Sequence, residues 1–397
     1  MHTTRTERHR IARAVTVAAA AIALLAGCTA APGGGDDPQE GGSLRIAAAG
    51  RGAAETFDPN LPASPVEFIR NGLAYEPLVN IAPSGDIVNL LATELTPNED
   101  ATVWHAKLRE GVTFHDGSEF DAADVLYTFQ LQADPEGPYG RPEAAEIDFD
   151  ATTVIDDHTI DIALHAANAT WNRSIVGARI VPEGAEDFST PNGTGPFRFE
   201  SGTIGTEATY TRNEDYWGEV LLDEVTVINV DDAQARVSAL TSGEVDVIED
   251  VPFVQADILA ETDGIELVQI LGNAAAPFYM RVDQAPFDDN RVREAFKLAI
   301  DREKCVDSAL FGFGKVANDL VGPGGYSYNR DLPQRTYDPE RAKELLAEAG
   351  YPDGITVELV TSDMFPGMLE CSIVFADSAK AAGITIELNQ VPANDLF

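Results

Sequence analysis

Thiol chemistry is the first chemistry that this sequence offers, because the chain has only three cysteines and each can be examined singly. Cys28 directly follows two small residues, Ala26 and Gly27, at the end of an apolar run. Cys305 and Cys371 lie in the last third of the chain, without the partner spacing of a metal site. Outside the cytoplasm, two cysteines in one region often pair. We therefore expect either a disulfide between Cys305 and Cys371 or two separate buried thiols.

The residues before Cys28 are organised like an export signal. Four arginines and one glutamate lie within residues 1–13, and the apolar run Val15–Ala26 follows them. A helix needs about 20 apolar residues to cross a bilayer, so this shorter run suits a signal-peptide core instead. Residues 29–42 are half glycine and proline, a composition typical of a flexible tether. The sequence thus predicts a signal peptide at 1–27 and a tether at 28–43.

The stretch Leu25-Ala26-Gly27-Cys28 resembles a bacterial lipobox. This resemblance implies cleavage before Cys28 and attachment of lipid to its sulfur and its new amine. Each buried CH₂ of an acyl chain contributes about 0.8 kcal/mol, so several chains would hold a protein at a membrane. We therefore expect a lipoprotein on the outer face of the cytoplasmic membrane. The alternative is a plain secreted protein in which Cys28 is incidental.

Catalytic motifs are missing from the sequence. It contains no Gly-x-Ser-x-Gly elbow, no His-Glu-x-x-His and no phosphate-binding loop. His115 beside Asp116 is the one pair that suggests a ligand set, and a hairpin turn explains it better. Carboxylate pairs carry no information in so acidic a chain. We therefore expect no enzyme, no cofactor and no metal site.

The charge of the chain excludes one class of partner. The 397 residues carry a formal net charge of −39. Loss of residues 1–27, with their four arginines and one glutamate, takes this charge to about −42. Such a surface repels phosphate backbones, which argues against nucleic-acid binding. A well-solvated surface is the simplest interpretation, and attraction of cationic ligands is the other.

Patterns typical of strands and helices alternate along the body of the chain, which predicts an α/β fold with helices covering a sheet. Strands are expected at 44–48, 104–108 with a return at 112–114, 154–164, 197–199, 208–211, 223–230, 245–248, 355–359 and 384–388. Helices are expected at 67–78, after Asp121, from 231 or 232 to 241, at 292–299, after Asp301, from Asp338 to 349 and before Gly383. Residues 134–146 are rich in proline, glycine and glutamate and are expected to form a loop.

An ordered set of short motifs identifies a family resemblance that covers residues 44 to about 390. The motifs are YEPLV (75–79), LREGVTFHDG (108–117), AADV (122–125), GTGPF (193–197), RNEDYWG (212–218), SGEVDV (242–247), PFDDNRVREA (286–295), AIDRE (299–303) and YDPERAKELL (337–346). Together they resemble the family 5 solute-binding proteins of ABC importers, which bind oligopeptides, dipeptides or nickel. Each motif alone is modest, whereas their order is specific.

The resemblance implies a periplasmic-binding-protein-like fold of type II, cluster C, in which two lobes enclose the ligand. Lobe I would comprise residues 44–73 and 190–272, with an extra subdomain inserted at 74–189, and lobe II would comprise 273–397. Family members extend further, so we expect lobe II to be incomplete here. The implied function of this monomer is to capture a solute and to deliver it to a membrane permease with its ATPase. A peptide is the expected solute, and a metal complex or a sugar stays an alternative.

We expect the ligand contacts to lie where the chain crosses between the two lobes. The candidate residues are Phe57, Glu249, Asp250, Asn273 and Phe278. Ordinary loop or core packing is the alternative for each of them. Two other classes of function stay open: a surface hydrolase on the same anchor, and a signalling or adhesion lipoprotein with the same fold.

Overall fold

The structure is a computed structural model that describes residues 40–82, 84–134, 137–269, 277–319, 328–363 and 365–392. The predicted signal peptide, Cys28, the tether up to residue 39 and the candidate ligand residue Asn273 lie outside the described residues. Within the described part, no helix combines the length and the apolar composition that crossing a membrane requires.

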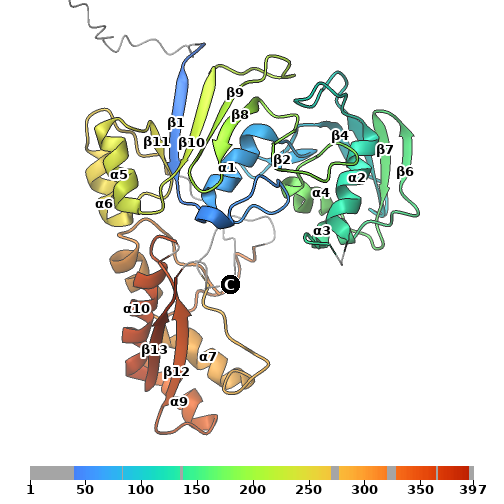
Figure 1. The fold of residues 1–397 in the computed structure, drawn as a ribbon. Coiled ribbons are helices and arrows are strands. Elements are labelled where there is room, and N and C mark those ends of the chain that lie inside the picture. The colour runs from blue at the N-terminus through green and yellow to red at the C-terminus, as the bar shows by residue number, and fades with distance from the viewer. Residues whose placement is uncertain are drawn as a thin grey trace, which may run out of the picture. The chain divides into compact units, whose positions relative to one another are not determined.

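A five-stranded sheet organises the first part of the chain, with the strand order β11-β1-β10-β9-β8 (Figure 1). Its strands are β1 (Ser43–Ala48), β8 (Phe197–Thr203), β9 (Glu207–Arg212), β10 (Glu224–Asn229) and β11 (Val247–Ile248). β1 is parallel to both of its neighbours, whereas β9 runs antiparallel to β10 and β8. All five strands were expected near these positions, but their spatial order was not.

Three helices accompany this sheet: α1 (Pro65–Ala74), α5 (Ala233–Ser242) and α6 (Phe253–Ala260). The predicted helix 67–78 is wrong at both ends, because Pro65 suits a first helical turn and the chain becomes extended at Tyr75. α5 begins and ends as predicted, with the Asp232 carboxylate accepting from the Ala235 N–H at 2.7 Å. Gly243 then ends the helix in a left-handed conformation, φ +74°. α6 was not anticipated.

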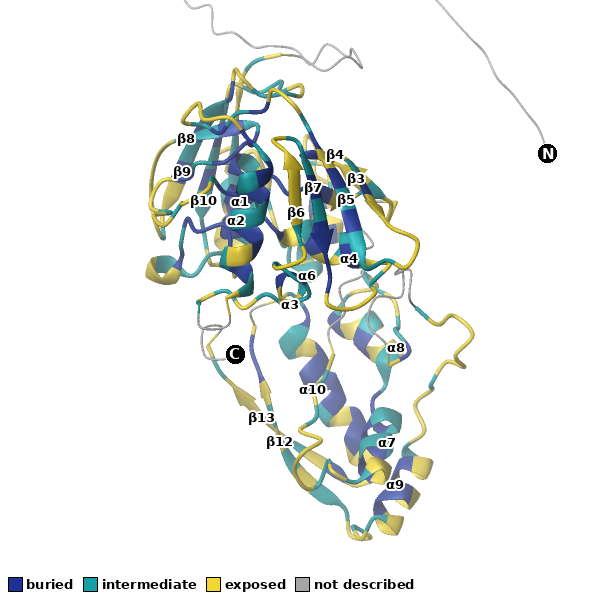
Figure 2. Cartoon of the chain, turned by 90° about the vertical axis from the view of Figure 1, so that its right-hand side faces the viewer, coloured by how far each residue is buried: buried dark blue, intermediate teal, exposed yellow. Residues whose placement is uncertain are grey.

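A second hydrophobic core forms around an antiparallel sheet with the order β4-β5-β7-β6. Its strands are β4 (Ala92–Pro97), β5 (Val103–Leu108), β6 (Thr153–Asp156) and β7 (Thr159–Ala163). The shorter elements of this part are β2 (Val79–Ile81), β3 (Ile87–Asn89), α3 (Pro142–Ala145), α4 (Trp171–Ser174) and η2 (Ile175–Gly177). Figure 2 shows β7 largely buried and β6 exposed beside it.

Two expectations for this second core are wrong. The return strand at 112–114 does not form, because β5 already pairs with β4 on one edge and with β7 on the other. Val112 and Phe114 are buried nonetheless and contribute to the core as part of a tight turn. The predicted loop at 134–146 contains the single helical turn α3, whose first residue is Pro142.

Helix α2 (Ala122–Ala133) begins directly after Asp121, as predicted. The Asp121 carboxylate accepts from the N–H groups of Ala123 and Asp124, and the Asp124 carboxylate accepts from the Asp121 N–H. This reciprocal box satisfies donors that a helix start otherwise leaves without partners. The buried residues Val125 and Phe129 lie about one helical turn apart, on the face of α2 that packs into this core.

The C-terminal part has its own core, in which helices pack on the parallel strand pair β12 (Ile355–Thr361) and β13 (Ile384–Gln390). The helices are α7 (Asn290–Ala299), α8 (Arg302–Lys304), the π-helical turn η3 (Cys305–Ala309), α9 (Pro339–Glu348), α10 (Met368–Ser378) and η4 (Ala379–Ala382). The predicted stripe Val292, Ala295, Phe296 and Ala299 is buried, and Asp338 caps α9 as expected. The boundaries predicted for the lobes and for the insertion stay a prediction.

Candidate functional site

The carboxyl ends of β1, β10 and β11 lie at one edge of the five-stranded sheet, because these three strands are parallel neighbours. The chain leaves this edge at residues 49, 230 and 249. In open α/β sheets, ligands bind outside the carboxyl ends of the strands, where successive connections diverge. β1 lies between β10 and β11, so the chain segments that follow these three strands diverge at this edge. This edge is the candidate functional site.

Arg236 of α5 holds two of the loops together. Its guanidinium donates to the carbonyl oxygens of Val230 (2.8 Å) and Asp231 (3.0 Å) after β10. It also donates to those of Glu249 (3.1 Å) and Asp250 (3.3 Å) after β11. The side chain is only 4% exposed, so these carbonyls replace its water. One buried cation therefore sets where the Glu249–Asp250 segment leaves the sheet.

Glu249 and Asp250 present two adjacent carboxylates at this edge. Burial raises the pKa of Glu249, and the neighbouring charge of Asp250 raises it further. Burial also raises the pKa of Asp250, against the opposing influence of Arg236. Asp250 has a left-handed backbone conformation, φ +55°, that few non-glycine residues adopt. Glu249 is exposed and Asp250 is half-buried, so both carboxylates can be reached from solvent by a cation, which their adjacent charges would attract.

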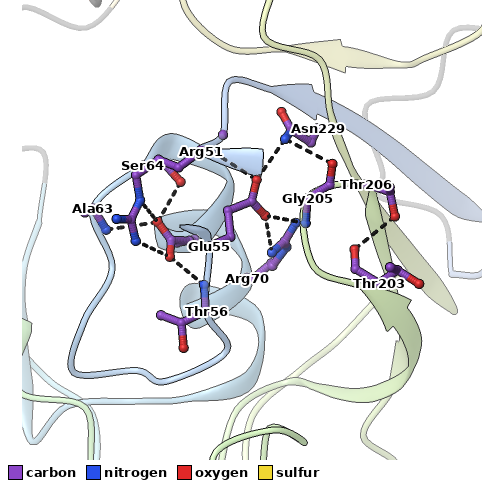
Figure 3. Close-up of polar contacts among 12 residues, drawn as sticks. Arg51, Glu55, Thr56, Ala63, Ser64, Arg70, Thr203, Gly205, Thr206 and Asn229 are labelled. Atoms are coloured by element: carbon purple, nitrogen blue, oxygen red, sulfur yellow. Dashed lines mark hydrogen bonds and ion pairs between the residues drawn. The ribbon is translucent and has the colours of Figure 1, made fainter. Parts of the chain in front are cut away.

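Buried ion pairs order the loop that follows β1 (Figure 3). Arg70 of α1 contacts the Glu55 carboxylate at 2.8 Å, and the side chains are 2% and 0% exposed. Glu55 also accepts from Asn229 at the end of β10 (2.8 Å) and from the Gly205 N–H (3.2 Å). Arg51 donates to both Glu67 oxygens, at 2.9 and 3.0 Å. The loop is thereby joined to α1, to β10 and to the β8–β9 turn.

Glu67 shows how completely these charges are compensated. Loss of water acts to raise its pKa, but hydrogen bonds from Arg51, from the Ser64 hydroxyl and from two backbone N–H groups outweigh this effect. The pKa therefore lies below its ordinary value of 4.5. A carboxylate with so many donors stays ionised and rigid at neutral pH.

Of the two aromatic candidates, Phe57 is a buried core residue and Phe278 is half-buried against the C-terminal core. Phe57 is 6% exposed, and its ring centre lies 5.0 Å from that of Phe199, with the Arg70 guanidinium 5.4 Å from the same ring. Phe278 packs on Phe375 in the C-terminal core, with 5.0 Å between ring centres. Packing accounts for both positions, and their contact with a ligand stays a prediction, as it does for Glu249, Asp250 and Asn273.

Sequence reasoning missed the polar residues that shape this edge, namely Glu55, Arg70, Asn229 and Arg236. Nothing in their local sequence distinguishes them from surface residues, because their contacts form only when separate elements pack together. Glu55 and Asn229, for example, are 174 positions apart. The only local signal is the cap Asp232, which begins the helix that carries Arg236.

His115 and Asp116 do not belong to a metal-ligand group among the described residues. No group of three or more His, Cys, Asp or Glu side chains within the described ranges is placed to hold a metal ion. His115 instead donates from Nε2 to the Gly195 carbonyl oxygen at 3.0 Å, and burial lowers its pKa. Asp116 receives hydrogen bonds from Ser118 and Asn192. The pair is part of a turn.

Comparison with known proteins identifies the class. The family model of bacterial extracellular solute-binding proteins, family 5, matches residues 86–397. The chain belongs to this family. The predicted family resemblance is thus confirmed.

Two curated relatives and one solved structure illustrate the similarity. The glutathione-binding protein GsiB of Salmonella paratyphi A is 31% identical over 298 residues, which are 72% of this chain and 58% of GsiB. The heme-binding protein A of Haemophilus influenzae is 31% identical over 307 residues, covering 69% of this chain and 56% of the relative. The chain therefore spans less than two thirds of the length of these relatives.

The structural likeness extends further along the chain. The periplasmic binding protein DppA of Helicobacter pylori, solved in complex with the peptide STSA, superposes with a TM-score of 0.76 at 24% identity. The match covers 90% of this chain and 75% of DppA. It confirms the predicted α/β fold of the type II periplasmic binding proteins.

Proposed function

We propose that this protein is an extracytoplasmic solute-binding lipoprotein of an ABC importer and that it captures small peptides. Membership of the family 5 solute-binding proteins is the observation that carries the proposal. The names of its relatives include a glutathione binder, and glutathione is itself a small peptide. The solute leaves unchanged and passes to a membrane permease that is driven by an ATPase.

The chemistry of the carboxyl edge supports a peptide over an anionic solute. A peptide offers one cationic amine together with backbone N–H and C=O groups that can pair like an added strand. Glu249 and Asp250 supply the negative charge for the amine. Glu249 is exposed and Asp250 is half-buried, so an amine can reach both carboxylates, and a bound cation would lower their raised pKa values.

Ligand-dependent stabilisation tests the proposal. We expect full-length protein from its own host to release a small solute in native mass spectrometry. We also expect a dipeptide or tripeptide to raise its melting temperature by several degrees, which corresponds to about 2–4 kcal/mol of linkage at saturation. Absence of any shift across peptide, metal-complex and oligosaccharide libraries would contradict the proposal.

The amine contact has its own variant. Asp250→Asn should weaken binding of a peptide with a free amine and leave binding of its N-acetylated form unchanged. Asp257→Asn is the matched control, because Asp257 is an exposed carboxylate on α6 close by in sequence. An equal loss of affinity for the free and the acetylated peptide would contradict the amine contact but would not contradict solute capture.

The lipid anchor depends on Cys28. A Cys28→Ala variant should appear in the medium or retain its signal peptide, because the alanine side chain cannot form the thioether. Cell fractionation with intact-mass measurement distinguishes these forms from the wild type. A variant that stays membrane-bound and fully processed would exclude lipidation at this residue.

A further inference from the structure

Two thiols that the proposed function does not use meet inside the C-terminal core. Cys305 is the first residue of η3 and Cys371 lies in α10, and each is 7% exposed. The Cys305 thiol donates to the Cys371 carbonyl oxygen at 3.7 Å, and each thiol shifts the pKa of the other. Both are free thiols in the structure. We propose that Cys305 and Cys371 form an intrachain disulfide that joins η3 to α10 in the exported protein.

The surrounding scaffold holds the two segments together without the bond. The Ser378 hydroxyl donates to the Ala299 carbonyl oxygen at 3.1 Å and accepts from the Asp301 N–H at 3.3 Å. Lys304, the residue before Cys305, contacts the Asp377 carboxylate at 3.0 Å. These contacts hold the segment 299–304, which leads to Cys305, against the C-terminal end of α10. The closeness of the thiols is therefore a property of the packed core.

The two sulfurs are chemically unequal, which sets the order of the exchange. The neighbouring Cys305 thiol lowers the pKa of Cys371, whereas Cys371 and burial together raise the pKa of Cys305. The Cys371 thiolate attacks a small disulfide such as oxidised glutathione, forms a mixed disulfide and releases one thiolate. Cys305 then loses its proton and displaces the second thiolate. Two S–H bonds are lost and one S–S bond forms, while the donor is reduced to two thiols.

The bond would enclose α9 and β12 in a covalent loop. A loop of roughly 65 residues restricts the unfolded chain considerably, and native disulfides of such size stabilise a fold more than a surface ion pair does. Since both sulfurs are shielded, the exchange takes place before the core closes or during local opening. The oxidised form is then protected from small reductants.

Peptide mapping tests the pairing directly on the full-length protein. Cells are quenched with iodoacetamide under denaturing conditions, and the chain is digested with trypsin without reductant. Cys305 falls in peptide 305–315 and Cys371 in peptide 344–380, whereas Cys28 falls in peptide 14–45, or 28–45 after removal of the signal peptide, so each sulfur is distinguishable. We expect peptides 305–315 and 344–380 to be linked, with loss of two hydrogens, and to separate on reduction.

A second experiment distinguishes a failure of the disulfide proposal from a failure of the proposed extracytoplasmic location. The reduced, folded chain is incubated with oxidised glutathione and mapped in the same way. If the peptides are linked after incubation with oxidised glutathione but not in protein from cells, the pairing is supported. The same result counts against export to an oxidising compartment. Alkylation of both cysteines in both arms, or linkage of either peptide to another chain, would overturn the proposal.

Thermal unfolding gives an independent readout. Reduction should lower the melting temperature of the oxidised protein by about 5–10 °C. The double variant Cys305→Ala/Cys371→Ala should melt at one temperature with or without reductant. An equal response of wild type and double variant to reductant would count against the bond.

Discussion

Buried charged side chains are the residues on which the N-terminal part depends most. Glu55 and Arg70 pair almost entirely out of water. Glu76 is also buried and accepts hydrogen bonds from the Thr194 hydroxyl (3.0 Å), the Tyr216 hydroxyl (2.8 Å) and the Trp217 Nε1–H (3.1 Å). A buried charge is tolerated only while its partners stay in place. Removing one partner is therefore more harmful than removing both.

The Glu55–Arg70 pair leads to the first prediction. Arg70→Met leaves the Glu55 carboxylate buried without its cation and should lower the free energy of unfolding by about 3–5 kcal/mol. The double variant Arg70→Met/Glu55→Gln should recover part of this loss in urea unfolding. Arg341→Met is the control, because Arg341 forms its ion pairs at 44% exposure and should cost less than about 1 kcal/mol. Equal losses for Arg70→Met and Arg341→Met would contradict the buried pair.

Glu76 leads to a pH prediction. Burial raises its pKa above the ordinary value of 4.5, although the three hydrogen bonds oppose the shift. The folded state thus holds this proton more tightly than the unfolded state. Its contribution to the free energy of unfolding is therefore greatest below pH 4.5 and declines as the pH rises through the folded pKa.

Comparison of variants isolates that contribution. Urea unfolding between about pH 4 and pH 7 should show the stability of Glu76→Gln rising relative to wild type as the pH increases. Glu67→Gln should show the opposite trend, because the pKa of Glu67 is lowered and its stabilisation is lost as the pH falls. Parallel pH profiles for wild type and Glu76→Gln would rule out the proposed cause.

Close backbone approach between elements decides how the turn before β8 meets α1. The Gly195 N–H donates to the Ala74 carbonyl oxygen at 2.9 Å. A Cβ atom on Gly195 would lie 2.5 Å from the Leu73 carbonyl oxygen. Only glycine permits this contact. The GTGPF motif thus specifies a junction between two segments that lie far apart in the sequence.

Substitution of Gly195, which is crowded, tests this junction, and substitution of Gly72, which has open space around it, is the control. Gly195→Ala should destabilise the protein by more than about 2 kcal/mol, because backbone atoms cannot move aside easily. Gly72→Ala should stabilise it by about 0.5–1 kcal/mol, because Gly72 lies in helix α1 with open space around its Cβ position. Chemical denaturation measures both changes. A neutral Gly195→Ala variant would show that the turn does not need this approach.

The acidity of the chain acts on the whole molecule. The 397 residues carry a formal net charge of −39, so like charges outnumber opposite ones on the molecule. Their mutual repulsion opposes the compact state and is screened by salt, with a Debye length of about 10 Å at 0.1 M. The described surface ion pairs respond in the opposite direction, but each contributes little. The net effect of salt should therefore be stabilising.

A salt titration tests this balance. Raising sodium chloride from low concentration to about 0.3 M should increase the melting temperature by several degrees. An uncharged osmolyte at equal osmolality should have a smaller effect, because it does not screen charge. A melting temperature that falls with salt would indicate that favourable ion pairs dominate instead.

The sequence by itself determined the features that depend on neighbours along the chain. The caps Asp121, Asp232 and Asp338 were predictable because each carboxylate bonds to an N–H group two or three residues ahead. Apolar stripes such as Val292 to Ala299 were predictable because helical periodicity places them on one face. The family resemblance rests on motifs of the same local kind.

Only the tertiary structure decided which distant segments meet. It paired β5 with β4 and β7, placed β1 between β10 and β11, and joined Glu55 to Arg70 and Asn229. It also placed Cys305 against Cys371 across 66 positions. Strand pairing and charge pairing depend on the packing of the whole chain, and residue types alone leave many partners equally acceptable. The local sequence therefore determines the elements, whereas the packing of the cores determines the site.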